Sequence, residues 1–229
     1  MDRLPAYKIS ALGETALIID FGNVIDESIN KLVHSLFYQI QNDPIPGMIE
    51  AVPGYSSLTI YYDILFIRNT LNKQTTAFEW VSESLKKYIL KENIETGDPQ
   101  MLIKVPVCYE TEFAPDLGFI ASQNKISHEE VIYLHTSTDY HIYMLGFLPG
   151  FAYMGMVDEK ISSSRKQKPE FVEAGSIGIA GKQTGIYPFD SPGGWQIIGR
   201  TDLDLFDPVK RNPCLLEAGD TVRFVNIDG

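Results

Sequence analysis

A glycine-rich yet apolar stretch between Tyr140 and Trp195 constrains this chain more than any other part of it. Three runs carry the pattern, GFLPGFAYMG (146–155), AGSIGIAGKQTGIYP (174–188) and DSPGGWQIIGRT (190–201), the last of which continues past Trp195. Glycines recur there where the pattern is otherwise typical of β-strands, and aromatic or amide side chains flank them. Because glycine has no Cβ, such runs let bare backbone approach a ligand or partner closely. We therefore expect short strands, tight turns and a candidate site in this segment.

Length and composition predict a globular protein with one large domain or two small ones, since 229 residues include 44% hydrophobic and 21% charged side chains. No apolar run is long enough for a membrane helix, and the first ten residues lack the pattern of a signal peptide. The cytoplasm is the expected compartment. Cys108 and Cys214 lie far apart, which favours neither a disulfide framework nor a thiolate metal site.

The net charge of −11 disfavours nucleic acid as a partner, because phosphate binding needs clustered Lys and Arg. Only residues 160–211 carry a positive balance, of +2, which is compatible with a small anionic ligand. The four histidines show no HExxH or similar spacing, so no metal site is predicted.

Residues 1–94 are expected to form a small α+β domain. Apolar side chains at helical spacing predict a helix from Ile25 to Ile40, ending before Pro44. Two β runs follow within 47–62, and Thr76 with Glu79 forms a capping-box pattern at the start of a second helix. This order predicts helices on one face of an antiparallel sheet. The polar residues 95–100 are typical of a linker.

Residues 100–229 are expected to form a mainly β domain. The run from Met101 is typical of a strand, Pro115 suits the first turn of a helix, and Ser127 with Glu130 predicts another capping box before a helix to His135. Short β runs separated by glycine and proline turns then fill the rest of the chain. Such a pattern favours a barrel or a sandwich.

The GFLPGF run contains no nucleophile or acid, and two interpretations stay open for it. It can be a ligand-lining loop, with Gly146, Phe147, Pro149, Gly150 and Phe151 as substrate-binding candidates. It can equally be a tight β connection whose aromatic side chains belong to the core. The chain has neither a P-loop nor a GxGxxG between strand and helix, so it shows no standard nucleotide cradle.

Gln183, Tyr187 and Arg200 are the further substrate-binding candidates. All three donate hydrogen bonds, and the Arg200 guanidinium matches a planar carboxylate. We expect Arg200 and Gln183 to share one pocket beside the GFLPGF loop. In the alternative interpretation, the Gln183 side chain hydrogen-bonds to backbone groups of a turn, and Arg200 forms an ion pair with Asp202 or Asp204.

His135 and Asp116 are the best candidates for acid–base catalysis, since a histidine near a helix end can titrate near neutrality and be oriented by a carboxylate. The alternative is a helix-terminal histidine and an aspartate in a first helical turn, both with structural roles. No GxSxG occurs. If the protein is part of an amidase, its nucleophile is expected to come from elsewhere.

Four segments in order resemble one family, that of allophanate hydrolase subunit 1, which includes the B-type subunit of 5-oxoprolinase and the kinase inhibitor KipI. They are PVCYETEFAPDL (106–117), HTSTDYHIYMLGFLPGFAYMG (135–155), AGSIGIAGKQTGIYPFDSPGGWQIIGRT (174–201) and LLEAGDTVRFV (215–225). The resemblance implies a small N-terminal α+β domain joined to a cyclophilin-like β-barrel.

In function, the resemblance implies a heteromeric complex with a protein of the allophanate hydrolase subunit 2 type and one of the LamB/YcsF type. Such a complex is similar to ATP-dependent 5-oxoprolinase, which opens the lactam of 5-oxoproline to give glutamate, with ATP used by the complex. Two alternatives are a KipI-like inhibitor of a sensor histidine kinase and a carboxyltransferase-like component acting on a urea-type substrate.

The chain departs from the family before the Ala-Gly-Ser run at 174–176. Members often carry a Pro-Arg pair and a further proline there, whereas this chain has Pro169, Glu170 and Glu173. The reversed charge at Glu170 is expected to weaken an anion contact. Arg165 and Lys168 are therefore left outside the candidate site.

Overall fold

The computed structural model describes residues 5–71, 74–89 and 101–227. The chain divides into two compact units, residues 1–99 and 100–229, and each is described by itself. The expected passage from a domain ending at 94 to one beginning at 100 falls within 90–100, outside the described residues.

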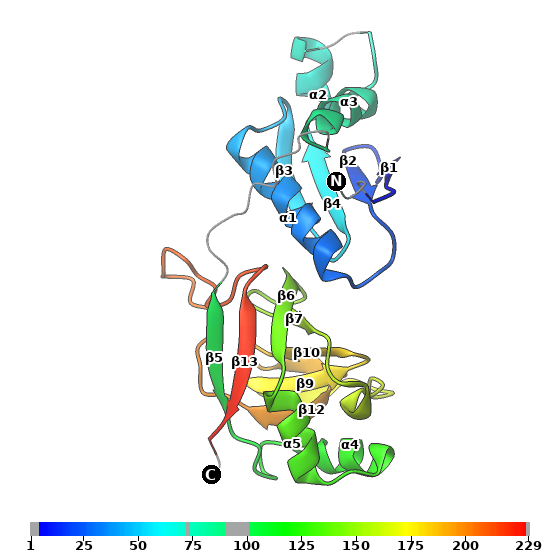
Figure 1. Cartoon of the computed structure of the whole chain (residues 1–229). Coiled ribbons are helices and arrows are strands. Elements are labelled where there is room, and N and C mark those ends of the chain that lie inside the picture. The colour runs from blue at the N-terminus through cyan, green and yellow to red at the C-terminus, as the bar shows by residue number, and fades with distance from the viewer. Residues whose placement is uncertain (1–4, 72–73, 90–100, 228–229) are drawn as a thin grey trace. The chain divides into compact units, whose positions relative to one another are not determined.

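The first unit is an antiparallel sheet in the order β1-β2-β4-β3, with two amphipathic helices that share one core with it (Figure 1). Its strands are β1 (Lys8–Ala11), β2 (Ala16–Asp20), β3 (Met48–Pro53) and β4 (Ser57–Tyr62). Its helical segments are α1 (Glu27–Asn42), α2 (Ile64–Phe66), a π-helical turn (Ile67–Leu71) and α3 (Ala77–Ile89).

Apolar alternation in the strands and helical spacing in α1 and α3 direct these elements into that core. Leu58 and Ile60 of β4 are fully buried, as are Val33 of α1 and Leu85 of α3. The capping box at the second helix is confirmed, because the Thr76 hydroxyl accepts from the backbone of Glu79 while the Glu79 carboxylate accepts from the backbone of Thr76.

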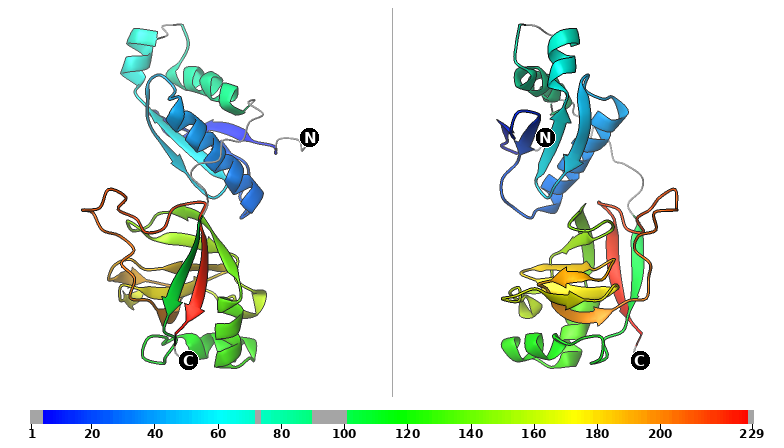
Figure 2. Two further views of the ribbon diagram at one scale, coloured as in Figure 1. Left: turned by 60° about the vertical axis from the view of Figure 1, so that its left-hand side comes forward. Right: turned by 180° about the vertical axis from the view of Figure 1, so that it is seen from behind.

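The second unit is a seven-stranded mixed sheet in the order β12-β9-β10-β7-β6-β13-β5. Its strands are β5 (Leu102–Val107), β6 (Asp139–Leu145), β7 (Ala152–Gly155), β9 (Ser176–Ala180), β10 (Gln183–Ile186), β12 (Gln196–Arg200) and β13 (Thr221–Asn226). Strands β5 and β13 pair in parallel and stand side by side in Figures 1 and 2, whereas the other neighbours are antiparallel.

A bridge between Cys108 and Arg200 joins the two ends of this sheet and nearly closes it. The Cys108 amide donates to the Arg200 carbonyl at 2.8 Å, and the Arg200 amide donates to the Cys108 carbonyl at 2.9 Å. The expected class, an α+β domain followed by a mainly β barrel, is therefore confirmed.

Smaller elements surround the barrel and carry several candidate residues. They are α4 (Leu117–Asn124), α5 (His128–Thr136), a 3-10 turn (Glu159–Ile161) and the short pair β8 (Glu170–Val172) and β11 (Ser191–Gly193). Helix α4 begins at Leu117, so Pro115 lies before the helix and not in its first turn; Asp116 is at the N-cap position but forms no side-chain cap hydrogen bond. At the start of α5 the Ser127 hydroxyl accepts from the Glu130 amide, as predicted. Within the described ranges, no helix is long and apolar enough to cross a membrane.

Candidate functional site

The GFLPGF loop is a tight connection between β6 and β7. The Gly146 amide donates to the Phe151 carbonyl at 3.1 Å, and the Phe151 amide donates to the Leu148 carbonyl at 3.0 Å. Phe151 is buried in the core, whereas Phe147 is 60% exposed and has a φ of 70°, which is uncommon for a residue with a side chain. Phe151 therefore belongs to the core, whereas Phe147 lies at the surface of the loop.

An aromatic cluster lies beneath this loop. The Phe151 ring centroid is 5.2 Å from that of Tyr187 and 5.4 Å from that of Trp195. Gly193 packs so closely on the Tyr187 ring that a Cβ at this position would lie 2.5 Å from the hydroxyl oxygen. Burial raises the pKa of Tyr187, although a hydrogen bond from the Trp195 backbone acts in the opposite direction. Tyr187 is therefore a neutral hydrogen-bonding group at neutral pH.

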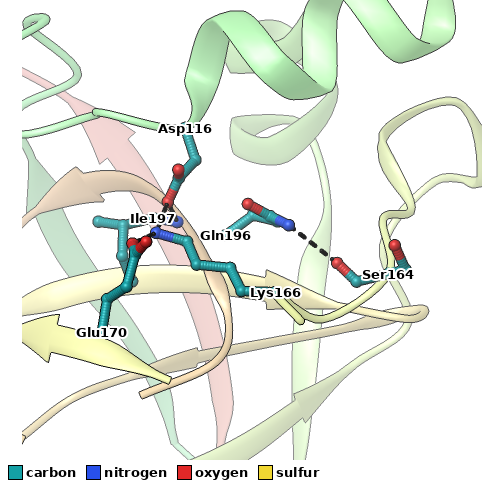
Figure 3. Close-up of polar contacts among 6 residues, drawn as sticks. All are labelled: Asp116, Ser164, Lys166, Glu170, Gln196 and Ile197. Atoms are coloured by element: carbon teal, nitrogen blue, oxygen red, sulfur yellow. Dashed lines mark hydrogen bonds and ion pairs between the residues drawn. The ribbon is translucent and has the colours of Figure 1, made fainter. Parts of the chain in front are cut away.

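Asp116 anchors strand β12 and the neighbouring loop. One of its carboxylate oxygens accepts from the Ile197 amide at 2.7 Å and lies 2.7 Å from the Lys166 ammonium. That ammonium also lies 2.7 Å from the Glu170 carboxylate, so it stands between two acidic groups (Figure 3). Burial alone would lower the pKa of Lys166, but the two carboxylates outweigh it and raise the pKa above its usual value. Lys166 is thus a fixed cation.

His135 lies in the core of the second unit with no exposed surface. Its Nδ1 is 2.8 Å from the Tyr109 hydroxyl and its Nε2 is 3.1 Å from the Thr184 hydroxyl. Because the Thr184 hydroxyl donates to the Gly178 carbonyl, it accepts from Nε2–H, which leaves Nδ1 to accept from Tyr109. Burial lowers the pKa of His135 to about 3. His135 and Asp116 thus have different hydrogen-bond partners and do not form an acid–base pair with each other.

A groove of about 320 Å³ opens beside the end of β12 and contains Arg200. Its lining consists of Ala174, Gly175, Pro188, Phe189 and residues 200–206. The rings of Phe189 and Phe206 meet edge to face with centroids 5.7 Å apart. The volume is at the lower end of the range for small-molecule sites, and the lining combines two aromatic rings and one guanidinium with Asp202 and Asp204.

The partner of Arg200 differs from both aspartates of the alternative interpretation. Its guanidinium forms an ion pair with Glu173 and lies over the Phe113 ring, with Cζ 5.7 Å from the ring centroid. The sequence could not indicate this pair, because Glu173 reaches Arg200 only through the pairing of β9 with β12.

Strand register does not bring Gln183 and Arg200 together. Arg200 pairs with Ser176 at one end of β9, whereas Gln183 pairs with Ala180 at the other end. Successive residues of a strand advance by about 3.3 Å, so the two side chains start from positions opposite the two ends of β9. Tyr187 lies at the Arg200 end, since its amide donates to the Ser176 carbonyl. The groove lining accordingly includes Arg200 and not Gln183.

Residues 7–216 match the family described as "Carboxyltransferase domain, subdomain C and D". The chain belongs to this family. It is 43% identical over 225 residues to the B-type 5-oxoprolinase subunit of Bacillus subtilis (strain 168), covering 96% of this chain and 93% of the relative. It is 36% identical over 231 residues to the corresponding 5-oxoprolinase subunit of Escherichia coli O157:H7, covering 98% and 97%. The resemblance inferred from the four sequence segments is confirmed.

Among solved structures, the carboxyltransferase-family chain is similar to TTHA0988, with a TM-score of 0.78 and 32% identity over 93% of this chain. This chain spans 40% of the length of that protein. The likeness covers both units and therefore supports the same fold for the whole described chain.

Sequence reasoning missed the ion-pair partners of two candidate residues. Asp116 pairs with Lys166, and Arg200 pairs with Glu173. The sequence signal was the local excess of charged residues at 165–173, but the partners lie on other elements. Within residues 5–71, 74–89 and 101–227, no group of three or more His, Cys, Asp or Glu side chains could hold a metal ion.

Proposed function

We propose that this chain is the B-type subunit of an ATP-dependent 5-oxoprolinase. The observation that carries the proposal is the near full-length similarity to two proteins named as that component of 5-oxoprolinase. In the reaction, the amide bond of the lactam ring is hydrolysed to give glutamate while ATP supplies the driving force. Its partners are a protein of the allophanate hydrolase subunit 2 type and one of the LamB/YcsF type.

The charges of the groove argue for ATP binding elsewhere in the complex. Asp202 and Asp204 line the groove together with Arg200, and Glu173 pairs with that arginine. Carboxylates outnumber cations there, whereas a triphosphate needs several positive groups or a bound metal ion. The residues that line this groove do not fit a nucleotide.

We expect the purified chain to show no 5-oxoprolinase turnover until both partner proteins are added. The physical reason is that the acid–base candidates are already engaged: Nδ1 of His135 accepts from Tyr109, and Asp116 is paired with Lys166. The measurement is ATP-dependent glutamate formation by the chain alone, with each partner separately and with both together. Turnover by the isolated chain would contradict the expectation.

We propose Arg200 as the contact for the substrate carboxylate. In the full complex, Arg200→Lys is expected to lower kcat/KM for 5-oxoproline about tenfold to a hundredfold, because lysine lacks the bidentate fork. The melting temperature should stay close to wild type, since partly exposed ion pairs contribute at most about 1 kcal/mol. Lys182→Ala is the matched control, because Lys182 forms a comparable exposed pair with Glu159. Equal kinetics for Arg200→Lys and wild type would remove Arg200 from the site.

A further inference from the structure

Glu173 lies on a fixed turn next to Arg200. The Ser176 amide donates to the Glu173 carbonyl at 3.2 Å, and the Ala174 amide donates to the Asp190 carboxylate at 2.8 Å. Ser176 is also the partner of Arg200 across β9 and β12. The backbone at Glu173 is therefore held beside the end of β12.

Within the ion pair, Arg200 is the more restrained side chain. Its side chain is 32% exposed and one face of the guanidinium lies over Phe113, whereas the Glu173 side chain is 58% exposed. Exposed ion pairs of this kind contribute little to stability. Glu173 can therefore turn into solvent at small cost while the guanidinium stays in place.

The groove offers an incoming carboxylate no second cation. Arg200 is the one basic side chain among the described residues that line it, and Asp202 and Asp204 add negative charge. The contact with Glu173 uses one terminal nitrogen of Arg200. A ligand carboxylate that binds both terminal nitrogens of this guanidinium in the bidentate manner has to replace Glu173 on that nitrogen.

We propose that Glu173 is an internal competitor for Arg200, occupying the position that the carboxylate of the substrate takes during binding. The inference rests on the proposed function, because it names how the substrate carboxylate reaches its contact. Binding then exchanges one carboxylate for another on the same guanidinium. Glu173 therefore raises the affinity that a ligand carboxylate needs in order to displace it. Anions that bind Arg200 more weakly than this do not displace Glu173.

The decisive variant is Glu173→Gln in the full complex. Glutamine keeps an oxygen that accepts from Arg200 but removes the competing charge. We expect KM for 5-oxoproline to fall about twofold to fivefold with kcat unchanged, which is the range expected for losing an exposed ion pair. Glu159→Gln is the control, because it removes one charge from the exposed pair with Lys182. A KM that rises in Glu173→Gln, or that falls equally in Glu159→Gln, overturns the proposal.

A direct titration separates this inference from the proposed function. The isotope-labelled chain is titrated with 5-oxoproline and, separately, with 2-pyrrolidinone, the same lactam without a carboxylate. The side-chain Nε–H signal of Arg200, assigned by its absence in Arg200→Lys, reports binding. Glu173→Gln should tighten 5-oxoproline about twofold to fivefold and leave 2-pyrrolidinone unchanged. If Glu173→Gln does not tighten 5-oxoproline binding, the competitor role is overturned, even when the complex turns over 5-oxoproline.

If the wild-type complex is inactive, the proposed function is overturned. The titration still decides the role of Glu173 in that case.

Discussion

His135→Ala is expected to lower the free energy of unfolding of the second unit by about 3–5 kcal/mol. The substitution removes a side chain with no exposed surface, together with the hydrogen bond between its Nδ1 and the Tyr109 hydroxyl. It also removes the ring that stacks on Phe224 at 4.4 Å between centroids. The measurement is thermal or denaturant unfolding, in which the melting temperature should fall by on the order of 10 °C or more.

The same substitution should change how stability depends on pH. The pKa of His135 is lowered to about 3 in the fold, whereas in the unfolded chain it is near the ordinary value of 6.5. Between these values only the unfolded state takes up this proton, so the contribution of His135 is complete above about pH 6.5 and is lost as the pH falls toward about 3. The variant should lose less stability than wild type over this window.

His128→Ala is the matched control, because His128 is exposed on the first turn of the same helix. Its effect on stability should be within about 0.5 kcal/mol. A catalytic role for His135 makes the opposite prediction. In that case, His135→Ala keeps its melting temperature while the reconstituted complex loses turnover.

Features set by local periodicity were predictable from the sequence. The helix before Pro44, the capping box at Thr76 and the Ser127 N-cap appear where the pattern placed them, because these depend on residues within a few positions of each other. The barrel followed from glycine-separated β runs together with the family resemblance.

The candidate site was less predictable, because its contacts depend on strand register. The sequence showed Gln183 and Arg200 as donors in neighbouring glycine-rich runs, but the pairing with β9 places them at opposite ends. In the same way, a histidine in the last turn of a helix gives no sign that Thr184 and Phe224 will enclose it. Register and burial arise from tertiary packing, which a single sequence does not specify.

Gly175→Ala is expected to have the second large effect, lowering the free energy of unfolding by about 3–5 kcal/mol. Gly175 has a φ of 80°, where side chains are disfavoured, and a Cβ there would lie 2.1 Å from the Thr201 carbonyl oxygen. The backbone cannot shift freely to relieve this contact. The Gly175 amide donates to the Tyr187 carbonyl at 2.7 Å, and its carbonyl accepts from the Thr201 amide at 3.0 Å.

Gly181→Ala separates the backbone strain from the steric contact, because Gly181 has a φ of 61° but no atom lies within 4 Å of an added Cβ. Like Gly175, it is held by backbone hydrogen bonds, here to Ser163. Its substitution should therefore cost only the backbone strain, about 1–2 kcal/mol. Since Gly175 and Thr201 both line the groove, the proposed function predicts that the Gly175 variant also weakens 5-oxoproline binding in the protein that remains folded. Equal unfolding free energies for the two variants would show that the contact with Thr201 relaxes at no cost. Unchanged 5-oxoproline binding by the Gly175 variant would place the substrate outside the groove.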